Sequence, residues 1–232
     1  MVIIGVALRY QFLKDGRSIL YLGERLRRTL QKAGAFVLPI VPVQDCNYME
    51  TKYDEFPPLT DSEKKIIDDS INLCDGIIFP GGCKITPFDV YLLERCIELN
   101  KKVLGICLGM QLLSNYKRNF LTERIVDDSH FQDDDSLLTH KVILNKKSKL
   151  YQLIGVEEIL VNSFHHYHVL ENSNLFTVGM SDDGFIEAIE LEDKDFVVGV
   201  QWHPEISYDF DALSRKIIDG FIKICEEAQL KN

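Results

Sequence analysis

Apolar runs and helix-type segments alternate through the first half of the chain. Residues 2–8 form a continuous apolar run, as expected of a parallel strand covered on both faces. Residues 19–32 carry leucines at every fourth position and predict a helix that stops at Gly34, before a strand at residues 35–41. The pattern continues with predicted helices at residues 61–73, 87–99 and from 108, and predicted strands at residues 75–79 and 102–106. This rhythm predicts a doubly wound, mostly parallel sheet in an α/β protein.

The second half of the chain predicts strands without full helices between them. Gly184 and Asp193 mark turns, which favours an antiparallel extension of the sheet in the C-terminal half. A last helix is predicted at residues 209–228. We find no repeat or linker and therefore expect one domain over residues 1–232. The predicted strands are residues 137–144, 158–161, 175–180, 185–191 and 196–201, and residues 45–60 and 127–135 are predicted loops.

The composition narrows the classes of partner. Hydrophobic residues make up 46% of the chain and charged residues 27%, as in soluble proteins with a substantial core. The net charge of −10 argues against nucleic acid as a partner. No apolar stretch reaches the roughly 18 residues that span a bilayer, and the first residues lack a basic leader, so we expect a cytoplasmic protein and no membrane partner. The six cysteines show no Cys-x-x-Cys spacing, and we expect no metal and no cofactor.

One cysteine stands at a predicted strand-to-helix turn. Gly105 and Gly109 flank Cys107 in the pattern of a nucleophile elbow, with cysteine at the position of the nucleophile. The turn places Cys107 at a helix N-terminus, which favours thiolate over thiol, and turns the amide of Leu108 toward a developing oxyanion. Gln111, four positions on, shares the helix face below the nucleophile and can bond an amide substrate. A buried cysteine packed between glycines fits the same five residues.

A thiolate needs a partner that protonates the leaving amine. His203 is the best candidate because it follows the strand at residues 196–201, and active sites of open α/β sheets gather at strand ends. Glu205, two residues on, can orient the imidazole of His203. A surface turn with an incidental ion pair would look the same, but the pairing with Cys107 favours a triad. The other histidines are His130, His140, His165, His166 and His168.

A glycine pair follows the predicted strand at residues 75–79. Gly82 can bring its backbone amide close to a ligand and complete an oxyanion hole with Leu108. A plain turn between strand and helix is the alternative.

These segments resemble a known family. Residues 80–82, 105–111 and 199–205 are similar to the three signatures of the class I glutamine amidotransferase superfamily. Residues 161–166 resemble the Asn-Ser-x-His-His stretch of its γ-glutamyl-γ-aminobutyrate hydrolase branch, and residues 140–142 a strand-start motif there. The resemblance covers nearly the whole chain.

The resemblance implies a flavodoxin-like sheet and a thioester on Cys107. It also implies a γ-glutamyl group held by Gln111 and by a loop that contributes Asn162, Ser163, His165 and His166. Two positions depart from the hydrolase branch. Leu108 stands where that branch commonly has arginine, as in amidotransferase glutaminase domains, and Tyr167 stands where it usually has glutamine.

The expected activity is hydrolysis of a γ-glutamyl amide in a small substrate, with release of glutamate. Because the chain is too short for a separate synthetase domain, we expect a freestanding hydrolase. The alternative is a glutaminase subunit that passes ammonia to a synthetase partner. A third class is a binding protein that kept the fold and lost the chemistry. The sequence predicts neither the amine nor the oligomeric state.

Overall fold

The computed structural model describes residues 1–117, 122–127, 129–171 and 173–230. One eleven-stranded sheet runs through the molecule. Its first five strands are all parallel, and they lie in the order β4 (Phe36–Ile40), β1 (Ile3–Ala7), β5 (Gly76–Phe79), β6 (Lys102–Ile106) and β13 (Val197–Val200). Apolar residues fill these strands because helices cover both faces.

The sheet continues beyond β13 with antiparallel strands. In order these are β12 (Ile186–Glu190), β11 (Phe176–Ser181), β8 (His140–Leu144) and β9 (Glu158–Val161). Two short strands lie off this path, β10 (Tyr167–Val169), which pairs with β12, and β7 (Thr122–Arg124), which pairs with β10. The predicted fold class, a doubly wound α/β sheet with an antiparallel extension in the C-terminal half, is confirmed.

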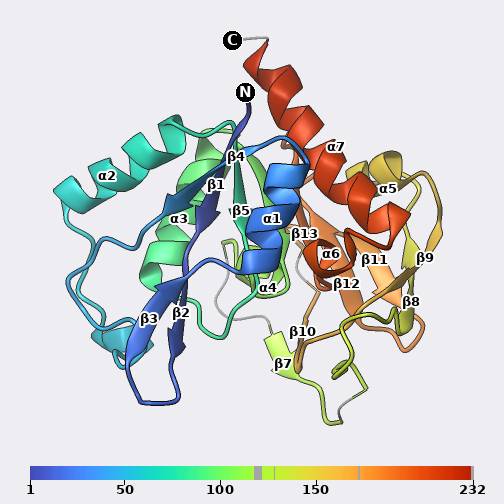
Figure 1. Ribbon diagram of the computed structural model, residues 1–232, viewed down its shortest axis with the longest axis horizontal. Helices are drawn as coiled ribbons and strands as arrows, with labels where there is room; N and C mark the ends of the chain where they lie inside the picture. The colour runs from blue at the N-terminus through green and yellow to red at the C-terminus, as the bar shows by residue number, and fades with distance from the viewer. Residues whose placement is uncertain (118–121, 128, 172, 231–232) are drawn as a thin grey trace.

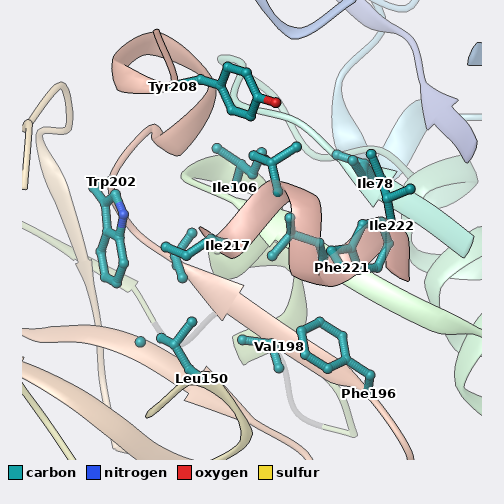
Figure 2. Close-up of a cluster of buried hydrophobic side chains, with 14 of the residues drawn as sticks. Ile78, Ile106, Leu150, Phe196, Val198, Trp202, Tyr208, Ile217, Phe221 and Ile222 are labelled. Carbon is teal, nitrogen blue, oxygen red and sulfur yellow. The ribbon is translucent and has the colours of Figure 1, made fainter. Parts of the chain in front are cut away.

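Two hydrophobic clusters pack on opposite faces of the sheet. One holds α1 (Glu24–Lys32), α5 (Lys149–Ile154) and α7 (Ala212–Gln229), and the other holds α2 (Asp61–Asn72), α3 (Pro87–Glu98) and α4 (Leu108–Ser114). Figure 1 shows α1 and α7 over the near face. In Figure 2, Ile217, Phe221 and Ile222 of α7 lie over Ile78 and Val198 of the sheet. The sheet is thereby held between two helical layers.

A hairpin replaces the start of the helix predicted at residues 19–32. Strands β2 (Arg9–Phe12) and β3 (Ser18–Tyr21) pair antiparallel, and the helix begins only at Glu24. Gly16 has a φ of 85°, and so supplies the left-handed residue of the hairpin turn. The strand pairing overrode the leucine spacing that had suggested a longer helix.

Other predicted elements differ from the structure only at their ends or were too short to predict. The N-cap of α2 is Thr60, which forms a capping box with Glu63, so residues 45–60 end where this helix begins. That loop contains a single 3-10 turn, η1 (Tyr53–Glu55). Residue 128 of the predicted loop at 127–135 lies outside the described residues. The short elements α5, α6 (Pro204–Ser207), β7 and β10 were not predicted.

None of the helices in the described part of the chain combines the length and the apolar character needed to cross a membrane.

Candidate active site

Cys107 lies in a strained turn between β6 and α4. Its φ is 51° and its ψ is −104°, a conformation that non-glycine residues rarely adopt. Its amide donates to the Val200 carbonyl at 2.8 Å, which ties the turn to β13. A Cβ on Gly105 would lie 2.6 Å from the Gly109 oxygen, and a Cβ on Gly109 would lie 2.0 Å from the Phe79 oxygen. Only glycine fits on either side of this cysteine.

The strand ends bring His203 and Glu205 to Cys107. His203 follows β13, the neighbour of β6, and its Nδ1 lies 2.7 Å from Glu205 Oε1. A side-chain hydrogen bond joins the imidazole to the Cys107 sulfur. Burial lowers the pKa of His203, but the charges of Glu205 and Cys107 outweigh it and raise this pKa well above 6.5. Both partners therefore favour the protonated form of the imidazole, which faces the sulfur as an acid.

Asn162 holds the backbone of His203 rather than lining a cavity. Its Nδ2 donates to the His203 carbonyl at 2.8 Å, and its Oδ1 accepts from the His203 amide at 2.8 Å. Its neighbour Ser163 donates from Oγ to the His130 carbonyl at 2.6 Å. Both side chains are buried and neither lines the cavity beside Cys107. The structure thus places these two predicted substrate-binding residues behind the site.

The turn at residues 80–82 packs directly on the proposed triad. A Cβ on Gly81 would lie 2.6 Å from His203 Cε1 and 3.6 Å from Cys107 Cβ. Arg9 holds this turn in place, because its Nε donates to the Pro80 carbonyl at 3.0 Å. The guanidinium is itself held by a buried ion pair with Asp89 at 2.6 Å. The close approach of backbone and imidazole is possible only with glycine at position 81.

Gly82 and Leu108 lie next to each other at one wall of a cavity. A Cβ on Gly82 would be 3.1 Å from Leu108 Cδ2, and both residues border the cavity together with Cys107. Leu108 is the first residue of α4, so its N–H has no acceptor within the helix. This arrangement leaves a helix-terminal amide beside the sulfur, where an oxyanion would form.

The cavity has a volume of about 530 Å³. Gln111, His165 and His166 line it, as the sequence predicts, and Gln111 Nε2 lies 3.3 Å from Gln201 Oε1 and 3.4 Å from the Tyr167 carbonyl. Its size is within the range of small-molecule sites. The structure therefore brings three of the five predicted substrate-binding residues to one hollow beside Cys107.

The sequence profile of the peptidase C26 family matches residues 87–205, more than half of the chain and the whole span from α3 to Glu205. The chain belongs to this family. Its relatives include class I glutamine amidotransferase-like proteins, so the family assignment supports a hydrolase.

The chain covers different shares of its relatives' lengths. YvdE of Lactococcus lactis, named as glutamine amidotransferase-like, is 29% identical over 67% of this chain and 76% of its own length. The CTP synthase of Thermotoga maritima is 30% identical over 77% of this chain but only 40% of its own length. The glutaminase domain of Trypanosoma brucei CTPS, solved with acivicin, has a TM-score of 0.66 at 17% identity and covers all of this chain and 95% of that domain. This last likeness concerns the fold.

Four contacts at this site were not predicted from the sequence. Phe164 lines the cavity with its ring edge-on to His203, at 5.8 Å between centroids. Lys84 also lines it, and its Nζ donates to the Tyr48 carbonyl at 2.7 Å. The other two are the hydrogen bond from Arg9 to the Pro80 carbonyl and the hydrogen bonds between Asn162 and the His203 backbone. No short motif marks these contacts, except that Phe164 occupies the variable position of the Asn-Ser-x-His-His stretch.

Proposed function

We propose that this protein hydrolyses the γ-glutamyl amide bond of a small substrate through a thioester on Cys107. The observation that carries the proposal is the chain of contacts from Cys107 to His203 and from His203 to Glu205, beside a cavity that Cys107 borders together with Gly82 and Leu108. A nucleophile, a base with its orienting carboxylate, and amides for an oxyanion are the parts that acyl transfer needs.

The first half of the reaction forms the thioester. The Cys107 thiolate attacks the γ-carbonyl carbon, and the carbonyl oxygen becomes an oxyanion that accepts hydrogen bonds from the Gly82 and Leu108 amides. As the C–N bond breaks, the His203 imidazolium gives its proton to the departing amine. Glu205 holds Nδ1 at 2.7 Å, which keeps the other ring nitrogen directed at the sulfur and the leaving group.

The second half regenerates the enzyme. Neutral His203 accepts a proton from water, whose oxygen attacks the thioester carbon, and the C–S bond breaks to release glutamate and the Cys107 thiolate. Gln111, His165 and His166 are the candidates for holding the glutamyl group, since they line the same cavity. Asn162 acts through the backbone of His203 and is a positioning residue.

A glutaminase subunit is the second candidate function. The similarity to CTP synthase and to a CTPS glutaminase domain favours it, and so does Leu108, which amidotransferase glutaminase domains often carry after the nucleophile. In that case the leaving group is ammonia, and a synthetase partner uses it. The same groups of the chain carry out the cleavage in both cases.

The decisive experiment measures glutamate release by the purified protein from glutamine and from a panel of γ-glutamyl amines. Turnover of a γ-glutamyl amine without any partner supports the freestanding hydrolase. Cleavage of glutamine alone, stimulated by a second protein, supports the glutaminase subunit. Cys107→Ala should abolish glutamate release, and Cys83→Ala is its matched control, because Cys83 borders the same cavity but lacks the histidine. Undiminished release by Cys107→Ala would refute the mechanism.

A further inference from the structure

Three histidines converge on one buried glutamate behind the cavity. His130 Nδ1 lies 3.3 Å from Glu187 Oε1, His140 Nε2 lies 3.5 Å from it, and His165 Nε2 lies 3.5 Å from it. The candidate ligand atoms of His130, His140 and Glu187 are all within 4.8 Å of one another. The four residues come from separate parts of the chain: the loop before β8, the start of β8, the loop after β9, and β12. The contacts with Glu187 have no part in the proposed reaction, although His165 also lines the cavity beside Cys107.

The outer nitrogens of two histidines are already engaged. His130 Nε2 lies 2.9 Å from Asp183 Oδ2, and His165 Nδ1 lies 3.0 Å from the Tyr167 carbonyl. Carboxylate and carbonyl oxygens only accept, so these outer nitrogens carry the protons. In the neutral rings, His130 Nδ1 and His165 Nε2 then present lone pairs to each other at 3.2 Å. This outer shell of carboxylate and backbone carbonyl is the arrangement that orients metal-binding histidines.

The centre of the cluster holds buried polar atoms at the limit of hydrogen-bonding distance from one another. Among the described residues, neither oxygen of Glu187 and neither ring nitrogen of His140 has a hydrogen-bond partner. The side chain of Glu187 is fully buried, and that of His130 is 2% exposed. A buried carboxylate needs a positive charge beside it, which either a protonated imidazole or a metal ion can supply.

The spacing fits a metal ion. In a tetrahedral zinc site with bonds of about 2.0–2.1 Å, neighbouring ligand atoms are roughly 3.3–3.4 Å apart. Glu187 Oε1 lies 3.3 Å from His130 Nδ1 and 3.5 Å from His140 Nε2, and the three ligand atoms all lie within 4.8 Å of one another. The side chain of His140 is 18% exposed, so the cluster reaches solvent at this residue. Imidazole nitrogens with one carboxylate oxygen are a donor set that suits zinc.

We propose that His130, His140 and Glu187 bind one zinc ion. The role of this ion is structural. It fastens the loop that carries His130 to the antiparallel part of the sheet. Because His130 Nδ1 lies 3.2 Å from His165 Nε2, the ion thereby also supports the cavity wall to which His165 belongs. The proposal does not depend on the γ-glutamyl substrate.

The test is zinc binding by the purified full chain, measured after dialysis by elemental analysis and by thermal unfolding with and without added Zn²⁺. We expect about one equivalent of zinc and a higher Tm with the metal. His140→Ala and Glu187→Gln should each weaken binding by at least about tenfold and lose the zinc-dependent rise in Tm. His168→Ala is the matched control, because His168 packs on the same Phe185 ring as His130 but lies outside the cluster.

Two further measurements keep the outcome decisive. Because the chain has free cysteines, zinc binding is repeated in a Cys83→Ala, Cys107→Ala double variant, which should still retain the metal. Co²⁺ in place of Zn²⁺ should give the visible absorption of a four-coordinate site in this variant and lose it on His140→Ala. Equal binding by wild type, His140→Ala and Glu187→Gln would overturn the proposal. Absence of any zinc-dependent Tm shift in wild type would also overturn it, and would mean that a shared proton balances Glu187.

Discussion

Asn162 brackets the peptide backbone of His203 with two hydrogen bonds of 2.8 Å, one to the amide and one to the carbonyl. The imidazole can keep its place beside Cys107 only if this backbone stays where β13 ends. We expect Asn162→Ala to lower kcat by about 100-fold, because small displacements of a catalytic group are costly. KM should change little, since Asn162 does not line the cavity.

The matched control for that variant is Ser163→Ala. Ser163 is equally buried and adjacent, but it bonds the His130 carbonyl and not His203. It should affect stability by about 1 kcal/mol and leave kcat near that of wild type. A rise in KM on Asn162→Ala, with kcat preserved, would show instead that Asn162 contacts substrate.

Gly81→Ala should displace the imidazole. The added Cβ would lie 2.6 Å from His203 Cε1, so either the ring or the turn must move. We expect a fall in kcat/KM of at least about tenfold. The free energy of unfolding should fall by less than about 1 kcal/mol. Gly23→Ala is the control, because a Cβ there meets nothing within 4 Å. Equal kinetics for the two variants would argue against a role for the close contact at Gly81.

Glu205→Gln should shift the pH dependence of the reaction. The charge of Glu205 is the largest influence that raises the pKa of His203, so its removal lowers this pKa. The imidazolium that protonates the leaving amine then disappears at lower pH, and the alkaline limb of the kcat/KM profile moves to lower pH. An NMR titration of the His203 ring measures the pKa itself. An alkaline limb that stays in place would contradict the assignment of His203 as the acid.

The ion pair of Arg9 and Asp89 should be a stability determinant. Both side chains are buried, at 2% and 0% exposure, so Asp89→Asn leaves the guanidinium without its counter-ion. We expect a loss of about 3–5 kcal/mol in the free energy of unfolding. The exposed pair of Lys32 and Asp209 is the control, and Lys32→Ala should cost less than about 1 kcal/mol. Chemical denaturation measures both, and similar losses would contradict the burial argument.

The extent to which this fold could be predicted depended on the length of its elements. Long periodic segments such as α2 and α3 and the continuous apolar strands were predicted nearly to their ends. The hairpin of β2 and β3 was missed because residues 19–32 also fit a helical spacing, and only the pairing of Arg9 with Tyr21 and of its neighbours decides between them. Elements of three to six residues, such as β10 and α5, carry too few positions for a period.

The site divides in a similar way. The strained turn at Cys107 and the closeness of His203 to Glu205 are local in sequence, and glycine spacing or a two-residue separation points to them. The bracket from Asn162 to His203 spans 41 residues, and the cluster around Glu187 joins four segments. A residue type alone does not reveal such contacts, so neither the hydrogen bonds from Asn162 to the His203 backbone nor the histidine cluster could be predicted from the sequence.

The central claim is that Cys107 carries a γ-glutamyl acyl group during turnover. The most direct test is intact-mass analysis and peptide mapping after incubation with an electrophilic γ-glutamyl analogue. We predict one adduct per chain, located on Cys107, formed more slowly by His203→Ala and absent from Cys107→Ala. An adduct on the exposed Cys83 in place of Cys107, or labelling that persists in Cys107→Ala, would contradict the account.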